Sequence, residues 1–309
     1  MAENFVFAPA AREEIKAKIA LTGASGGGKT LSALFLAYGL CGDWKKIAVA
    51  DTENGSAKQY CGQTFGDVKI PSGAGSFFHC DLGPPYGCER MIELIEYVER
   101  QEKYEVLVFD SFSHAWSGAG GVLETVDRIG KLEGWKKMTP LFRKLIDTVR
   151  FSSLHFIGTM RTRTEFEIET STNEQGKTKV VGVKKLGTKP EMRDGVDYEF
   201  TTVFALNQEH FASVDKDRTN LFASRPPALL DVGVGKLIGE WAAGAVCQIG
   251  SAEWVKLRAD ELENYGGTID GLATLWKSVA GHKPRLVPAD FARLLAAKDA
   301  SKARIGAQS

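Results

Sequence analysis

The sequence predicts an α/β fold whose central sheet is mostly parallel and flanked by helices. Over residues 1–160, short apolar runs alternate with amphipathic helical segments, which favours parallel strands because each parallel crossover passes through a helix. Residues 161–230 alternate apolar and polar positions on both sides of NEQG at 173–176, the pattern of an added β-hairpin region. The remainder is helical, so we expect a core at 1–230 and a small helical C-terminal region at 231–309.

Each core element has its own sequence signal. Buried strands are indicated by short runs rich in Ile, Val, Leu and Phe, and helices by apolar residues three or four apart. The segment 89–102, for example, places Met91, Ile92 and Ile95 among charged residues. In chain order, we expect a strand at 16–22, a helix from residue 31, a strand at 45–53, a helix at 89–102, a strand at 105–111, a helix at 141–149 and a strand at 153–160.

The segments after the hairpin predict further strands and then helices. Residues 197–206 and 210–222 have strand-like patterns, and we expect both as antiparallel additions to the sheet. In the C-terminal region, Leu272 and Leu275 are spaced for one helix face. Residues 298–309 are expected to be a frayed end.

Charge and hydropathy exclude two classes of protein. The chain has 39 Lys plus Arg and 39 Asp plus Glu, so its formal net charge is zero, which argues against a histone-like polybasic nucleic-acid binder. The composition, 43% hydrophobic and 25% charged, is that of a globular protein. No apolar run approaches the roughly 20 residues that span a bilayer. We therefore expect a cytoplasmic protein with no membrane partner.

The strongest motif is GASGGGKT at residues 23–30, which matches G-x-x-x-x-G-K-T between a predicted strand and a predicted helix. Such a glycine-rich turn points its backbone N–H groups at a phosphate, and the helix N-terminus adds partial positive charge. Lys29 is expected to reach the β and γ phosphates of ATP, and the Thr30 hydroxyl to bind Mg²⁺. The expected nucleotide-binding residues are Gly23, Ala24, Ser25, Gly26, Gly27, Gly28, Lys29, Thr30 and Leu31.

Two acids follow buried strands and complete this candidate site. Asp110 ends the apolar strand EVLVF, a position from which a carboxylate can hold Mg²⁺, usually through water. Glu53 follows the strand IAVA and can reach over the γ-phosphate to activate a water. Alternatively, Glu53 is a solvated loop acid or a capping partner of Asn54 and Ser56.

With these motifs, the chain resembles the RecA-like P-loop ATPases, most closely the phage-encoded nucleotide-binding branch that accompanies recombination and single-strand annealing genes. The resemblance covers roughly residues 15–225. It implies a RecA-like P-loop core, ATP hydrolysis with Glu53 as the water-activating residue, and the cytoplasm of the host cell. The motifs that carry it are GASGGGKT at 23–30, ADTENGSA at 50–57, VFDSFSHAW at 108–116, IGTMRTRTEF at 157–166, KPEMRDGVDYEF at 189–200 and VDKDRTNLF at 214–222.

The resemblance also assigns a role to Lys216 and Arg218. RecA-like enzymes commonly carry a K-x-R or K-x-K pair that reaches the neighbouring subunit's nucleotide and stabilises charge on the γ-phosphate. Residues two apart on a strand lie on the same face, so both cations can point at one ligand. This role implies a homo-oligomer, either a ring or a filament. The alternative is a solvated pair neutralised by Asp215 and Asp217.

One position departs from the family pattern. Relatives such as RecA end the strand that senses the γ-phosphate with Asn-Gln, whereas this chain has Thr159-Met160 followed by Arg161. Methionine is a poor hydrogen-bonding partner for a phosphate, so any sensor role falls to Thr159 or Arg161.

The resemblance places DNA-facing loops after residue 110 and after residue 160. Between Gln175 and Pro190 there are five lysines and no acid, a pattern that favours salt-dependent binding of a nucleic-acid backbone. The alternative is a solvated hairpin. In the first loop, 111–140, tryptophans and lysines either contact DNA or pack. The expected DNA-binding residues are Arg161, Arg163, Lys177, Lys179, Lys184, Lys185 and Lys189.

Together, the motifs and the resemblance imply a DNA-stimulated ATPase that binds single-stranded DNA and supports phage homologous recombination or strand annealing. The expected cofactors are ATP and Mg²⁺. The expected partners are single-stranded DNA, further copies of the chain, and a single-strand binding protein or another replication or recombination protein. Two alternatives are an ATP-dependent loader or accessory factor of a replicative helicase, and a nucleotide-gated binding module with little turnover.

Overall fold

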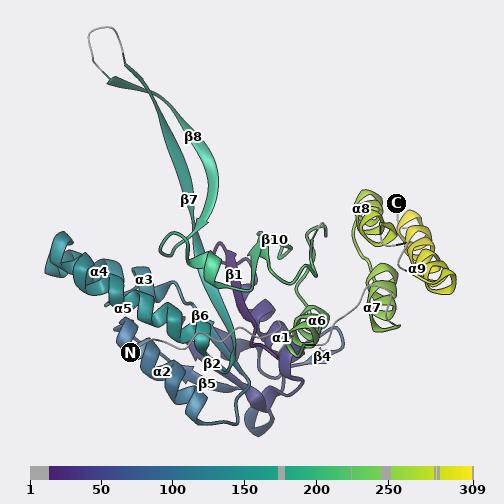
Figure 1. Ribbon diagram of the computed structural model, residues 1–309, viewed down its shortest axis with the longest axis horizontal. Coiled ribbons are helices and arrows are strands. Elements are labelled where there is room, and N and C mark those ends of the chain that lie inside the picture. Colours follow the sequence, from purple (N-terminus) through teal and green to yellow (C-terminus); the bar gives the residue numbers. More distant parts are fainter. Residues whose placement is uncertain are drawn as a thin grey trace, which may run out of the picture. The chain divides into compact units, whose positions relative to one another are not determined.

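The computed structural model describes residues 14–172, 178–223, 225–244, 252–281, 283 and 286–307, with the backbone alone between 164 and 187 and at 253. The chain divides into two compact units. The larger contains residues 17–237, and the smaller contains the chain from residue 238 onward together with the segment before residue 17. Figure 1 shows the elements of both units.

The larger unit is built on an eight-stranded sheet with the order β10-β9-β1-β7-β6-β2-β5, and β8 pairs with β7 outside this path. All neighbouring strands are parallel except the pairs β9–β10 and β7–β8. A mostly parallel sheet flanked by helices is the predicted fold class, which is confirmed. The strands are β1 (Lys18–Gly23), β2 (Ile47–Asp51), β5 (Phe78–Asp81), β6 (Val106–Asp110), β7 (His155–Thr172), β8 (Thr178–Pro190), β9 (Thr202–Leu206) and β10 (Ala212–Asp217).

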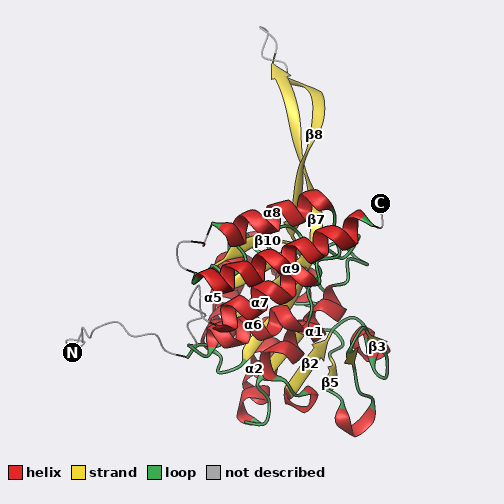
Figure 2. Cartoon of the chain, turned by 90° about the vertical axis from the view of Figure 1, so that its right-hand side faces the viewer, coloured by secondary structure: helices red, strands yellow, loops and turns green. Residues whose placement is uncertain are grey.

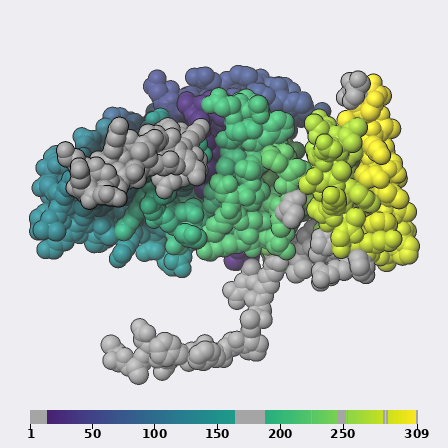
Figure 3. Space-filling model, turned by 90° about the horizontal axis from the view of Figure 1, so that it is seen from above, coloured from purple at the N-terminus to yellow at the C-terminus, as the bar shows by residue number. Residues whose placement is uncertain are grey.

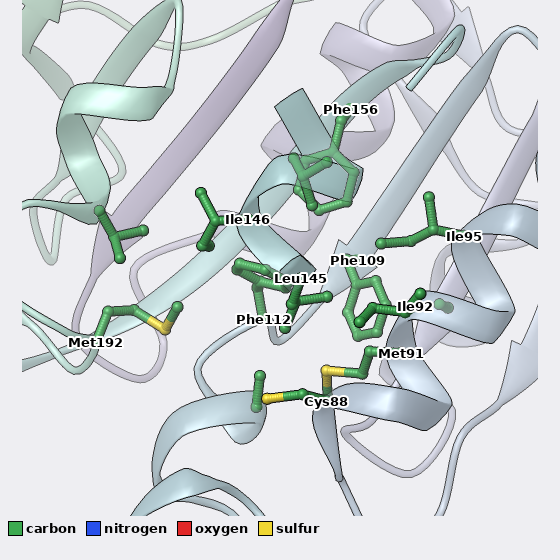
Figure 4. Packing of buried hydrophobic residues seen from close by; sticks show 14 of the residues in the cluster. Cys88, Met91, Ile92, Ile95, Phe109, Phe112, Leu145, Ile146, Phe156 and Met192 are labelled. Atoms are coloured by element: carbon green, nitrogen blue, oxygen red, sulfur yellow. The ribbon is translucent and has the colours of Figure 1, made fainter. Parts of the chain in front are cut away.

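Helices connect these strands and bury both faces of the sheet. On one face, apolar residues of α2 and α5, including Ile92 and Leu145, pack with Phe109 and Phe156 of the sheet (Figure 4). The neighbouring strand residue Ile157 is also fully buried, and because alternate residues face opposite sides, the other face is covered as well. The helices are α1 (Lys29–Cys41), α2 (Cys88–Arg100), α3 (His114–Ser117), α4 (Val122–Ile129) and α5 (Lys131–Phe151).

Short elements complete the larger unit. Four 3₁₀ helices and a small two-stranded sheet lie between the main elements. They are η1 (Trp44–Lys46), η2 (Ser56–Tyr60), η3 (Gly73–Gly75), η4 (Val196–Glu199), β3 (Thr64–Phe65) and β4 (Val68–Lys69).

The start of α6 (Val232–Ala242) packs on α1 at glycine residues. A Cβ on Gly39 would collide with the Val232 carbonyl, and a Cβ on Gly235 would collide with the Leu36 carbonyl. The two helices therefore touch backbone to backbone.

The predicted hairpin is present and longer than expected. The strand expected at 153–160 and the first hairpin strand are one continuous element, β7, which projects with β8 beyond the other strands (Figures 1 and 2). The β7–β8 ladder begins at Thr162 opposite Pro190 and runs to Thr172 opposite Thr178. The turn that joins these strands lies outside the described residues.

Two expectations for the larger unit are wrong. β9 pairs with β1 in parallel, because residues 191–201 carry the chain back to the amino edge of the sheet, where the Thr201 amide donates to the Lys18 carbonyl. The segment 197–200, expected as strand, instead contains most of η4. The segment 111–140, a DNA-facing loop on the family resemblance, has a helix-like sequence at 121–135, and this stretch is indeed helical as α4 and the start of α5, preceded by α3.

The smaller unit is helical, as expected. Its helices are α7 (Ala252–Glu263), α8 (Ile269–Ala280) and α9 (Pro288–Gly306). They pack around buried apolar residues that include Val255, Leu275 and Leu294, and Figure 3 shows α8 and α9 in contact in yellow-green and yellow. α9 continues to Gly306, so the frayed end expected from residue 298 is instead mostly helix. Within the described ranges, no helix is both long and apolar enough to cross a membrane.

Candidate active site

The carboxyl ends of β1, β2, β6 and β7 meet at one edge of the sheet, and the phosphate turn, Glu53, Asp110 and Arg161 lie there. Lys216 and Arg218 lie at the opposite edge, beside the start of β9. The register pairs Gly23 of β1 with Arg161 of β7, and Asp51 of β2 with Asp110 of β6. Residues that directly follow these positions are consequently brought together, although they come from four separate parts of the sequence. Ligands of open α/β sheets bind at this edge.

Residues 24–28 form the turn between β1 and α1. Gly26 and Gly28 have φ values of 80° and 82°, in the left-handed region that favours glycine. α1 begins at Lys29 with no side-chain cap and no acid in its first turn, so its first N–H groups are not satisfied by a side-chain cap and can bind an anion.

Lys29 folds back over this turn. Its ammonium donates to the carbonyls of Gly23, at 2.9 Å, and Ala24, at 2.8 Å. Burial lowers the pKa of Lys29, while the nearby negative charges of Glu53 and Asp110 act in the opposite direction. A bound phosphate would provide a stronger partner for this cation than two neutral carbonyls.

Asp110 is held by two hydroxyl groups. The Thr30 hydroxyl donates to one carboxylate oxygen at 2.6 Å, and the Thr159 hydroxyl donates to the other. Asp110 is only 1% exposed, and burial raises its pKa. A hydroxyl and a carboxylate are the oxygen ligands that Mg²⁺ prefers, and a cation here would offset the cost of burying the carboxylate. These residues therefore fit Mg²⁺, bound directly or through water.

Glu53 lies in the loop after β2, and that loop is fixed by Asp51. One oxygen of Asp51 accepts the Glu53 amide at 2.7 Å, and the other accepts the Ala57 amide at 3.0 Å. Burial acts to raise the pKa of Asp51, but its hydrogen bonds to His79 and to these amides outweigh burial and hold the pKa below its usual value. The sequence also allowed Glu53 to be a helix-capping residue together with Asn54 and Ser56. The structure does not support that interpretation, because the carboxylate that accepts the loop amides belongs to Asp51.

Arg161 lies within the site. Its Nε and Nη2 both donate to Glu53 Oε1, at 3.1 and 2.9 Å. Sequence reasoning assigned Arg161 chiefly to DNA, with a γ-phosphate sensor as a second possibility. In the structure, both Arg161 and the other sensor candidate, Thr159, contact acids of the candidate site.

Three residues near Glu53 were not identified from the sequence. The Thr52 hydroxyl accepts the Ser111 amide at 2.7 Å and lies 2.7 Å from His114 Nδ1, which links the ends of β2 and β6. The His114 ring stacks on Tyr86, with centroids 4.7 Å apart. Burial lowers the pKa of His114, and the charge of Arg161 lowers it further. The sequence signal that could have indicated His114 is the group of Ser and His residues in VFDSFSHAW, which directly follows a strand that ends in an acid.

Lys216 and Arg218 share one acceptor. Lys216 Nζ donates to the carbonyls of Asp197, at 2.9 Å, and Tyr198, and Arg218 Nη2 donates to the same Tyr198 carbonyl at 2.6 Å. Burial lowers the pKa of Lys216, and the neighbouring Arg218 charge adds to this effect. Asp217 accepts the amides of Thr219 and Phe222. Within the described part of the chain neither cation forms an ion pair, so carboxylates do not neutralise them directly.

The hairpin residues are described only in part. Arg163 lies opposite Lys189, whose ammonium pairs with Asp194 at 3.0 Å. Lys177 lies outside the described residues, as do the side chains of Lys179, Lys184 and Lys185. The backbone register nevertheless places acids across from this lysine-rich strand. The β7 residues concerned are Glu165 opposite Gly187, Glu167 opposite Lys184 and Glu169 opposite Gly182.

The tryptophans of the first loop differ in their surroundings. Trp116 packs edge-on against Phe142, with centroids 5.2 Å apart, and lies 5.9 Å from Trp135. Trp116 is therefore part of the packing of α3 on α5. Trp135 is 37% exposed and Leu132, one turn earlier, is 83% exposed.

A strand, a glycine-rich phosphate turn and a helix, with an acid at the end of a nearby parallel strand, define the class of P-loop nucleoside triphosphatases. The family comparison agrees with this class. The family model described as an AAA domain matches residues 15–226, more than half of the chain, so the protein belongs to this AAA domain family. A search of curated proteins finds no match.

Proposed function

We propose that the protein is a Mg²⁺-dependent ATPase that binds single-stranded DNA and supports phage homologous recombination or strand annealing. The AAA domain itself indicates nucleotide binding and hydrolysis. The observation that carries the proposal is the assembly of the Thr30–Asp110 pair and Glu53 beside the phosphate turn, from three separate parts of the sequence.

Each residue of this assembly has a role in the proposed reaction. The turn amides and Lys29 bind the phosphates, and Thr30 with Asp110 holds the metal. Mg²⁺ neutralises charge on the β and γ phosphates when it is bound. Glu53 accepts a proton from the attacking water, and Arg161 orients the Glu53 carboxylate through its two hydrogen bonds.

We also propose that the active form is an oligomer in which Lys216 and Arg218 act on a neighbouring subunit's nucleotide. Their convergence on the Tyr198 carbonyl supports this role, because it brings both cations together at the end of β10, and neither has a carboxylate partner within the described residues. A bound γ-phosphate would replace the neutral Tyr198 carbonyl by a charged acceptor, and hydrogen bonds from Lys216 and Arg218 to a charged acceptor are stronger.

The DNA part of the proposal rests on the β7–β8 hairpin. Residues 161–190 contain seven basic and four acidic residues, so the segment keeps an excess of positive charge even when the acids of β7 are counted. An excess of this size supports backbone binding that weakens as salt rises.

ATP turnover with and without single-stranded DNA tests the proposal. We expect Mg²⁺-dependent release of ADP and phosphate, stimulation by single-stranded DNA, and DNA retention at low salt that is lost at high salt. Turnover without stimulation or DNA retention would remove the DNA part. Co-purification with a replicative helicase in that case would favour the loader alternative, and binding without turnover would favour the nucleotide-gated module.

A further inference from the structure

The turn between β9 and β10 lies directly against the phosphate turn. A Cβ built on Gly23 would lie 2.7 Å from the Leu206 carbonyl oxygen, and one on Gly27 would lie 3.2 Å from the Asn207 carbonyl oxygen. The contact is possible because β9 is parallel to β1, so both strands deliver their following turns to the same edge of the sheet.

His210 occupies the position in this turn that faces the start of α1. A Cβ on Gly28 would lie 2.9 Å from His210 Nδ1, so the imidazole lies beside the residue that precedes Lys29. The His210 side chain is exposed, and no hydrogen bond to it is present within the described residues. Its ring nitrogens are therefore available to a ligand at the phosphate turn.

The backbone of the turn holds His210 in a conformation that non-glycine residues rarely adopt. Its φ is 70°, in the left-handed region. Asn207 braces this arrangement: its side-chain oxygen accepts the amides of Glu209, at 3.0 Å, and Phe211, at 2.9 Å, and its carbonyl accepts the His210 amide at 3.2 Å. Backbone strain of this kind needs support from its surroundings, and it concentrates at ligand sites.

We propose that His210 is a nucleotide-binding residue that donates a ring N–H to the phosphate chain of the nucleotide held by residues 23–30. The proposal extends the nucleotide part of the proposed function and rests on it. His210 adds to the site a donor that comes from outside the phosphate motif, and Asn207 acts as a positioning residue that holds the turn.

Binding of Mg²⁺–ADP and of inorganic pyrophosphate to His210→Ala, measured by calorimetry, tests this assignment. We expect the Kd for both ligands to rise about tenfold, the effect of losing one hydrogen bond to a charged group. His210→Gln retains a side-chain N–H and should recover part of the loss. Gln208→Ala, an exposed neighbour in the same turn, is the matched control and should bind both ligands as the wild type does.

Asn207→Ala and the double variant test the positioning role. Asn207→Ala should weaken ADP binding, and adding His210→Ala to it should cost much less than the same change in the wild type. Thermal unfolding checks that each variant is folded. If His210→Ala is not folded, the role of His210 is decided by comparing the Kd values of His210→Gln and Gln208→Ala.

The outcomes separate this inference from the proposed function. If the wild type binds ADP and His210→Ala binds it with the same Kd, the nucleotide-binding role of His210 is wrong, and the proposed function is unaffected. A loss for ADP but not for pyrophosphate would overturn the phosphate contact. Wild-type protein that binds neither ligand would remove the nucleotide proposal itself.

Discussion

Arg161 directs two nitrogens, Nε at 3.1 Å and Nη2 at 2.9 Å, at the same carboxylate oxygen of Glu53. The acid comes from the loop after β2, whereas the arginine belongs to β7. The pair is partly exposed, so its contribution to stability is small. Its importance lies in geometry, because it fixes where the carboxylate points.

Glu53→Gln removes the proposed base but keeps the size of the side chain. We expect ATP turnover to fall by at least about a hundredfold, with the Kd for ATP little changed. Glu102→Gln, at an exposed position between α2 and β6, is the control. Turnover close to that of the wild type would remove Glu53 from the mechanism.

Arg161→Ala leaves Glu53 without its orienting partner. We expect kcat to fall by about tenfold or more while the Kd for ADP stays near the wild-type value, because a misplaced group affects the chemical step. Arg161→Lys keeps the charge but not the two-nitrogen geometry and should be intermediate. Arg163→Ala, two residues further along β7, is the control, with turnover of all variants measured without DNA. If it lowers kcat as much as Arg161→Ala does, the orienting role is wrong.

Asp110→Asn removes a buried negative charge that the two hydroxyl groups only partly compensate. Without nucleotide, we expect the variant to melt about 2–4 °C above the wild type. Adding Mg²⁺ with ADP should raise the melting temperature of the wild type but hardly that of the variant. Equal ligand-induced shifts in both proteins would contradict the metal-binding role.

Mixed oligomers test whether Lys216 and Arg218 act on a neighbouring subunit. Lys29→Ala and Arg218→Ala should each be nearly inactive alone, since a cation that stabilises the transferring phosphate contributes about 10³-fold or more. When they are mixed, some sites combine an intact phosphate turn with an intact Arg218, and turnover should partly return. A mixture of Lys29→Ala with Glu53→Gln is the control, because each of its sites lacks a residue from the same subunit. Equal recovery in both mixtures, or none in either, would argue against action in trans.

His114 gives the stability a pH dependence. Burial and the Arg161 charge lower the pKa of His114 from its ordinary value of 6.5, while Glu53 and Glu191 oppose this shift. The unfolded chain therefore binds the proton more readily, and the free energy of unfolding should fall as the pH drops below about 6.5. His114→Asn should lose this component, which urea unfolding at about pH 8 and about pH 5.5 can measure. The same pH dependence in both proteins would assign it to other groups.

The strands and the phosphate turn were predictable because their signals are local. Buried strands such as β6 are short apolar runs, and the turn before Lys29 is a contiguous motif. Pairing between distant segments was not predictable in this way. The parallel direction of β9 depends on the path of residues 191–201, and the contact of Thr52 with His114 depends on the register of β2 with β6.

The charge of the β7–β8 hairpin also depends on pairing between separate segments. All of β8 lies within the acid-free run from Gln175 to Pro190, and its partner strand supplies Glu165, Glu167 and Glu169 at paired positions. A hairpin's charge belongs to both strands, and the register that combines them becomes visible only in the structure.

β7 leaves no flexible connection between the candidate active site and the hairpin. The ladder with β8 starts at Thr162, the residue after Arg161 and only three after Thr159. From Arg161 to Thr172 the strand extends about 36 Å at the usual rise per residue. The two side chains that contact Asp110 and Glu53 therefore belong to the same continuous strand as the hairpin, so a displacement of the hairpin would be transmitted through the backbone of β7 directly to both acids.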